Sequence, residues 1–179
     1  MKAFKRIIMI IAAFLLAGLL FAAIAPKKFS VEKQVTINKP KQEVFDYIKQ
    51  LKNQDNYSVW AKIDPKMEKS YKGLDGAVGF VSAWNSNNKD VGKGEQEIIK
   101  IDEGKRIDYQ LRFFEPYESI SPAYMTTEEN EPDKTTVKWG IEGEMPYPMN
   151  ITLIFMDMDK AIGNDLTKGL ENLKLELEK

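Results

Sequence analysis

The 179-residue sequence contains no cysteine and no histidine. Without cysteine there is no thiolate nucleophile and no site for lipoprotein-type modification. Without histidine the chain lacks the usual general base near neutral pH, and it cannot build a Ser-His-Asp triad. Most zinc sites are excluded too, because they draw on these two residue types. We therefore expect no metal ion and no cofactor, and any acid-base chemistry would fall to carboxylates, tyrosine or lysine.

Basic residues are scarce outside the N-terminus. Residues 1–28 hold five of the 26 lysines and arginines and none of the 27 acidic residues, so the remainder carries a net charge of −6. This balance argues against nucleic acid as a partner, because phosphates are bound by clustered basic side chains. It also argues against broad adhesion to anionic lipid heads, except at the Lys27-Lys28 pair.

Near the N-terminus, Ile7–Ile24 is an apolar run of eighteen residues with no charge. As a helix it would be ~27 Å long, close to the ~30 Å hydrocarbon core of a bilayer. Lysine and arginine flank the run on both sides, with one more positive charge before it than after it. We expect a single membrane span that leaves the N-terminus inside and the following domain outside the cytoplasm.

Two other interpretations of this run remain open. Ala23-Ile24-Ala25 has the small-x-small form of a signal-peptidase site, but the run exceeds the usual ~7–15 residues and Pro26 would follow the cleaved bond. A buried core helix is disfavoured because the run is apolar on every face and ends in lysines. We favour an uncleaved anchor in residues 1–28, followed by one domain in residues 29–179.

The domain begins as a strand and a helix, and then becomes a series of strands. The segment 41–51 is apolar on one helical face, and 54–60 suggests a second short helix or turn. Alternating patterns between turn residues predict strands at 30–37, 67–72, 78–85, 94–101, 106–114, 119–128 and 135–144. No helix separates the last six, so the sheet should be antiparallel.

The C-terminal stretch has apolar residues three and four apart from Ile151 to Leu177, which predicts a long helix with one apolar face. Gly163-Asn164-Asp165 interrupts it and suggests a break, with a final segment from Asp165 to Leu177. The predicted fold is therefore α+β of the helix-grip type. A curved antiparallel sheet of about seven strands would surround a long C-terminal helix, with one N-terminal transmembrane helix added.

A family resemblance supports this layout. The chain resembles the START-like (SRPBCC) superfamily, and within it the bacterial polyketide cyclase/dehydrase and lipid-transport group. The likeness is carried in order by Val35–Pro40 with Glu43–Ile48, Trp60, Gly76–Gly79, Val91–Glu95, Trp139-Gly140 with Met145-Pro146, and Ile162-Gly163 with Lys168–Lys174. The superfamily includes lipid and sterol carriers, cyclases, ring-hydroxylase subunits and chaperone co-factors, so the resemblance implies a fold without fixing an activity.

Large apolar residues on inward faces are the main candidates for a site. Tyr109 and Phe113 share one strand face, and Trp139 lies between Val137 and Ile141 on another. A ligand pocket between the sheet and the C-terminal helix is predicted to be lined by Trp60, Phe80, Trp84, Tyr109, Phe113, Trp139, Phe155 and Met158. The alternative is that these residues simply fill the core.

Carboxylates give a weaker signal. Glu95 and Glu97 share a strand face and Asp108 is expected on the next strand, an arrangement that suits acid-base chemistry or a cation. A solvated hairpin face explains it better, so no catalytic residue is predicted.

Three functions remain open. The first is a membrane-tethered module that binds a hydrophobic, lipid-like molecule. The second is a cyclase/dehydrase-type enzyme, which needs a polar group in the pocket such as Tyr109, Tyr124 or an inward glutamate. The third is a protein-interaction module, which an exposed apolar patch would indicate.

Overall fold

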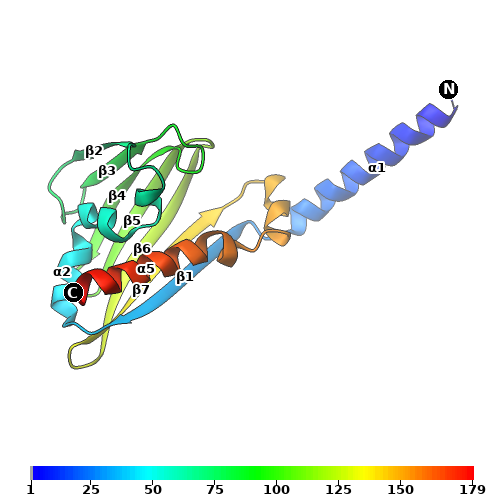
Figure 1. Ribbon diagram of the computed structural model, residues 1–179. Coiled ribbons are helices and arrows are strands. Elements are labelled where there is room, and N and C mark those ends of the chain that lie inside the picture. The colour runs from blue at the N-terminus through cyan, green and yellow to red at the C-terminus, as the bar shows by residue number, and fades with distance from the viewer. Residues whose placement is uncertain (1) are drawn as a thin grey trace.

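The structure of the protein is a computed structural model that describes residues 2–179. A long N-terminal helix, α1 (Lys2–Ile24), projects away from a folded domain built on one curved sheet (Figure 1). Only residues 25–27 separate α1 from the first strand. Within α1, Ala3–Ile24 is long and apolar enough to cross a bilayer, with a mean hydropathy of 3.0 and almost all of its surface exposed.

The sheet has seven antiparallel strands in the order β1-β7-β6-β5-β4-β3-β2. The strands are β1 (Lys28–Ile37), β2 (Glu68–Lys72), β3 (Val81–Asn85), β4 (Lys93–Asp102), β5 (Arg106–Glu115), β6 (Ser119–Glu131) and β7 (Lys134–Glu144). All seven match predicted strands to within a few residues, and the antiparallel prediction is confirmed. Successive side chains of a strand point to opposite faces of the sheet, so Ile107, Tyr109 and Leu111 of β5 all point inward and are buried.

Short helices follow β1 and close one end of the sheet. They are α2 (Lys41–Lys49), η1 (Leu51–Asn53), α3 (Gln54–Tyr57) and α4 (Trp60–Ile63). The predicted helix 41–51 is thus split, with α2 ending at Lys49. Its apolar face is buried as the spacing indicated, through Val44, Phe45 and Ile48.

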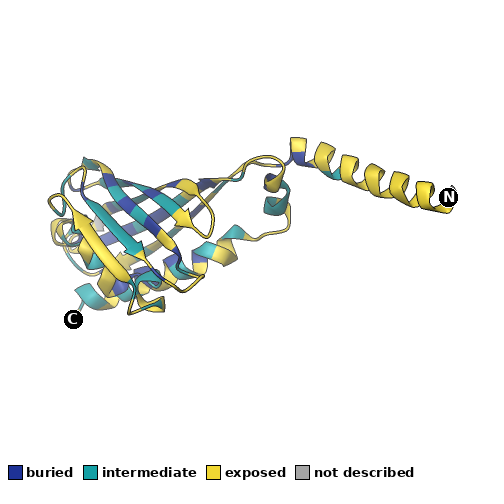
Figure 2. Ribbon diagram, turned by 90° about the horizontal axis from the view of Figure 1, so that it is seen from above, coloured by how far each residue is buried: buried dark blue, intermediate teal, exposed yellow. Residues whose placement is uncertain are grey.

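The C-terminal helix α5 (Asn164–Leu177) lies across the concave face of the sheet (Figure 1). Leu166, Leu170 and Leu173 form its buried face and meet the inward residues of β5, β6 and β7 in one core. Figure 2 shows this pattern, with dark strips of buried residues along the sheet and an exposed α1. The helix-grip prediction is confirmed.

The predicted helix from Ile151 is wrong in its first half. The chain instead forms a 3₁₀ helix, η2 (Met149–Ile154), an irregular stretch, and a π-helical turn, η3 (Asp159–Gly163), before α5 begins. The regular α-helix begins at Asn164, close to the predicted final segment, but Gly163 keeps helical backbone angles, so the helix changes from π to α there and does not break. Phe155 and Met156 therefore do not lie on the gripping helix. The apolar spacing continues through 151–163, but η2 contacts the end of α1, and only from η3 onward does the chain pack against β1 of the sheet.

Side chains of the C-terminal segment, from η3 to the end of α5, contact the edge strand β1. Lys174 Nζ donates a hydrogen bond to the carbonyl oxygen of Thr36 at 2.8 Å, and the backbone N–H of Asn38 donates to Glu178 at 2.6 Å. Lys33 Nζ lies 2.7 Å from a carboxylate oxygen of Asp159. These contacts fix the C-terminal segment against the edge strand.

Candidate ligand-binding site

Tyr109 is the most unusual side chain of the concave face. It is fully buried, and its hydroxyl group is without a hydrogen-bond partner. Burial raises the pKa of Tyr109 well above its ordinary value, and the negative charges of Asp75 and Asp108 add to the rise. The hydroxyl therefore stays protonated at neutral pH. It is a buried donor in need of an acceptor, which is energetically costly in an apolar core.

Aromatic rings surround the centre of the same face. Trp139 makes edge-to-face contacts with Tyr57 at 5.7 Å and with Trp60 at 5.9 Å between ring centroids. Tyr57 is also buried, but its hydroxyl lies 3.6 Å from the sulfur of Met125. Burial raises the pKa of Tyr57 as well, with contributions from Tyr109 and Tyr47. Both phenol hydroxyls thus stay protonated, and only that of Tyr57 has a hydrogen-bond partner.

A second aromatic pair lies on the inner face further along the strands. Trp84 and Phe113 contact each other edge to face at 5.9 Å between centroids, and both are only partly buried. The indole N–H of Trp84 donates to the carbonyl oxygen of Val91 at 3.3 Å. The ring lies across Gly94, where a Cβ would be 2.6 Å from Trp84 Cζ2. The glycine thus leaves room for the tryptophan on the concave face.

The other predicted lining residues differ in how deeply they are buried. Phe80 is buried and stacks on Tyr71 with centroids 6.1 Å apart. Met158 is partly buried against the core, whereas Phe155 is 80% exposed and lies outside it. Seven of the eight predicted residues therefore belong to the core or pack against it. Whether they line a ligand pocket stays a prediction.

Exposure increases along β5 toward one end of the sheet. On its inner face Tyr109 is fully buried, whereas Phe113, four residues later, is partly exposed. This path is ~13 Å long at ~3.3 Å per residue. Phe113 pairs with Ser119 at the start of β6, and Lys28 at the start of β1 pairs with Glu144 at the end of β7. Because all neighbours are antiparallel, Phe113 lies at the end of the sheet from which α1 departs.

The outer face of the sheet carries the charged residues. Arg112 is held by two carboxylates, with Nε 2.6 Å from Glu95 and Nη2 2.6 Å from Glu97. These hydrogen bonds raise the pKa of Arg112. The three side chains border a surface hollow of about 380 Å³ on β2–β5. The predicted carboxylate pair is thus neutralised by an ion pair, which sequence reasoning missed because Arg112 lies on a different strand.

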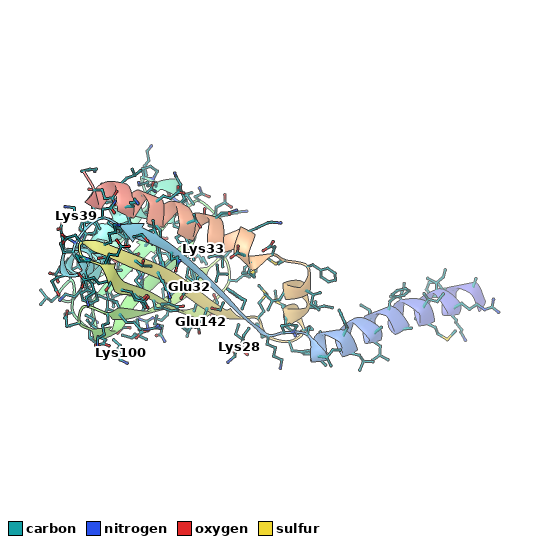
Figure 3. All side chains as sticks on the ribbon, turned by 90° about the horizontal axis from the view of Figure 1, so that it is seen from below. Lys28, Glu32, Lys33, Lys39, Lys100 and Glu142 are labelled. Atoms are coloured by element: carbon teal, nitrogen blue, oxygen red, sulfur yellow. The ribbon has the colours of Figure 1, made fainter. Side chains whose placement is uncertain are left out.

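A smaller hollow of about 170 Å³ lies on the same outer face, beside Tyr124. Lys100 and Glu142 line it (Figure 3). Tyr124 donates a hydrogen bond to Glu32, and the guanidinium of Arg106 lies 4.0 Å from its ring centroid. Burial and Glu32 raise the pKa of Tyr124 to about 12. Tyr124, one of the polar groups considered for catalysis, therefore faces away from the concave side.

No group of three or more carboxylates among residues 2–179 is arranged to hold a metal ion. On the concave face the buried Tyr109 hydroxyl is a single hydrogen-bond donor, and the ammonium group of Lys33 on the same face is paired with Asp159. A lone phenol hydroxyl suits hydrogen bonding to a mostly apolar molecule better than the coordination of a cation.

Comparison with known proteins decides the family. Residues 28–178 match the family described as polyketide cyclase/dehydrase and lipid transport. The chain belongs to this family. The match begins at the first residue of β1 and does not include α1. No curated protein matches the sequence as a relative.

Solved structures show the same START-like fold at low identity. The di-domain ARO/CYC protein BexL from the BE-7585A biosynthetic pathway has a TM-score of 0.61 at 15% identity, covering 99% of this chain and 60% of BexL. Mll3558 from Rhizobium loti has a TM-score of 0.59 at 18% identity, covering 83% and 96%. The Aha1 dimer from Colwellia psychrerythraea has 0.57 at 14%, covering 84% and 96%. At these identities the likeness concerns the fold alone.

Proposed function

We propose that this protein is a membrane-anchored START-like domain that holds a hydrophobic, lipid-like molecule against the concave face of its sheet. The observation that carries the proposal is the Tyr109 hydroxyl, a fully buried donor without an acceptor. A ligand with one hydrogen-bond-accepting oxygen and an apolar body would satisfy it. Family membership supports this use of the concave face.

The shape of the inner face suggests how such a molecule would lie. Its oxygen would meet Tyr109, and its apolar part would follow the inner face of β5 toward Trp84 and Phe113. These partly buried rings are the side chains that must move, since the core around them is otherwise filled. The path ends at the end of the sheet from which α1 departs, so an anchored domain would open toward the bilayer.

Binding is favoured over catalysis by the state of Tyr109. Its raised pKa keeps the hydroxyl protonated near neutral pH, so it acts as a hydrogen-bond donor and not as a base. The ion-paired carboxylates Glu95 and Glu97 face the opposite side of the sheet, away from such a ligand. A cyclase or dehydrase step would lack a base at the concave face.

The test is native mass spectrometry of the full-length protein, extracted gently from its own membrane. We expect a discrete added mass on the wild-type chain, retained on Tyr57→Phe, and reduced on Tyr109→Phe. Tyr57→Phe is the matched control, because it also removes one buried phenol hydroxyl but one that already has a partner. A bare wild-type chain at full mass, with no uptake of added lipid, would overturn the binding proposal.

The same spectrum tests the anchor. A chain mass that includes residues 1–25 is expected for an uncleaved membrane helix. A mass shortened by that segment would support the signal-peptide alternative and remove the anchor from the proposal, while leaving ligand binding to be judged from the added mass.

A further inference from the structure

A charge-free segment lies beside the end of the membrane helix. Residues 145–156, here called the juxtamembrane segment, contain no Asp, Glu, Lys or Arg, although these make up 30% of the chain. The segment contains η2 and connects β7 to the C-terminal helices. In Figure 1 it forms a separate lobe at the base of α1, away from the gripping helix. It does not contribute to the concave face described above.

The juxtamembrane segment is held on α1 by a buried asparagine. Asn150 is fully buried, and its Nδ2 donates hydrogen bonds to the carbonyl oxygens of Ala22 at 2.7 Å and Ala25 at 3.1 Å. Ala22 lies in the last turn of α1 and Ala25 directly after it, where no helical N–H remains to bond the carbonyl groups. Ala22 and Ala25 are themselves buried, in contrast to most of α1. The backbone N–H of Met145 also donates a hydrogen bond to the backbone carbonyl oxygen of Lys27 at 2.8 Å.

The other side of the segment is apolar and exposed. Five large side chains lie there without a covering element: Tyr147, Met149, Ile154, Phe155 and Met156. Phe155 is 80% exposed, more than any other phenylalanine of the described chain. Exposure of this much contiguous apolar surface indicates a docking surface.

The position of Asn150 fixes the depth of this surface. If the apolar run Ile7–Ile24 fills the hydrocarbon core, Ala22 lies at its boundary. A segment hydrogen-bonded to Ala22 then lies at the same level, between the acyl chains and the headgroups. Aromatic side chains such as Tyr147 and Phe155 are favoured at that level, and Lys27 and Lys28 lie where headgroup phosphates would be (Figure 3 shows Lys28 at this junction).

We propose that the juxtamembrane segment is a membrane-inserting element, which dips Met149, Ile154, Phe155 and Met156 into the lipid interface. It would fix the orientation of the domain on the bilayer surface, which a single helix alone does not. Its continuity with the exposed apolar surface of α1 identifies lipid as the occupant. The inference rests on the proposed membrane span of α1.

Because the chain has no native cysteine, a single introduced cysteine can be labelled selectively, and the label reports whether its site lies in lipid or in water. Single substitutions Leu16→Cys, Met149→Cys, Phe155→Cys and Leu175→Cys are made in the full chain, labelled with a nitroxide and reconstituted into phosphatidylcholine vesicles. Collision with oxygen, which concentrates in lipid, is compared with collision with a water-soluble nickel chelate. Leu16 marks the span, and Leu175, which is 66% exposed at the far end of α5, is the matched apolar control.

We expect labels at 16, 149 and 155 to collide mainly with oxygen, and the label at 175 mainly with the nickel chelate. If 16 lies in lipid but 149 and 155 lie in water, the inserting element is overturned and the span is kept. If 16 lies in water, the proposed anchor fails and the inference fails with it. Labels at 149 and 155 that neither reagent reaches would show a protein partner, such as a second copy, and would also overturn it.

Discussion

Gly169 of α5 packs its backbone directly against the indole ring of Trp139 on β7. A methyl group added at Gly169 would lie 2.8 Å from Trp139 Cζ3. Trp139 is held in turn by Tyr57 and Trp60, so its ring cannot move aside easily. This contact sets how closely the gripping helix approaches the sheet.

Gly169→Ala should therefore destabilise the domain despite the better helix propensity of alanine. Overpacking costs ~1–3 kcal/mol, which exceeds the gain of up to ~1 kcal/mol from propensity. Urea unfolding in detergent micelles, followed by tryptophan fluorescence, measures the loss. Gly163→Ala is the control, because its new methyl group meets the flexible side-chain ends of Lys33 and Asp159 and not a fixed ring. An equal loss in both variants would contradict the role of Trp139.

Tyr109→Phe should raise the free energy of unfolding. The substitution removes a buried hydroxyl without a partner and keeps the ring, so about 1–2 kcal/mol is expected from the lost desolvation penalty. The unliganded protein should be used in the same urea experiment. Tyr57→Phe should bring no such gain, because it removes a hydroxyl that contacts the Met125 sulfur. A destabilised Tyr109→Phe variant would show that the hydroxyl has an acceptor.

Arg112→Gln should destabilise the outer face of the sheet by about 1 kcal/mol at low salt. It leaves Glu95 and Glu97 adjacent on β4 without the cation that both contact. High salt should reduce the loss, since screening weakens both the original attraction and the new repulsion. Arg106→Gln serves as the comparison, because Arg106 contacts the single carboxylate of Asp108 and should show a smaller effect. A loss unaffected by salt would point to packing instead of charge.

Tyr124 should make stability depend on pH under alkaline conditions. Its pKa in the folded protein is about 12, against ~10 in an unfolded chain. Between these values the unfolded chain releases the proton while the folded protein keeps it, so stability falls as pH rises. Tyrosine-selective ¹³C NMR, with Tyr124→Phe for assignment, follows the titration. Glu32→Gln should lower the pKa of Tyr124, because it removes the charge next to the hydroxyl.

The strands and the gripping helix could be predicted because the spacing of their apolar residues reflects which side chains face the core. Ile107, Tyr109 and Leu111 alternate with polar residues, as a half-buried strand requires. The apolar pattern from Ile151 to Met158 led to the wrong prediction of a continuous helix, because spacing alone does not say what the apolar side chains face. Apolar residues that cover a core and apolar residues that face outward beside α1 have identical spacing.

The parts that could not be predicted depend on partners far apart in the chain. Arg112 neutralises glutamates on another strand, and Asn150 bonds to carbonyl groups more than a hundred residues earlier. Neither residue has a local pattern that marks its role. The unpartnered hydroxyl of Tyr109 is similarly invisible in sequence, because the alternation of β5 predicts only that the side chain points inward.

The occupied edge of β1 has a consequence for copies anchored in the same bilayer. If α1 spans a membrane as proposed, the chains would be concentrated in a plane and share one orientation, which are conditions that favour joining sheets edge to edge. Lys174 covers the Thr36 carbonyl group on one free edge, and the other edge, β2, has only five residues, of which Glu68, Lys69 and Lys72 are charged. Short, charged or covered edges resist strand addition. The short, charged β2 therefore resists strand addition at one edge, and at the β1 edge Lys174 already occupies one of the carbonyl groups that a second sheet would use.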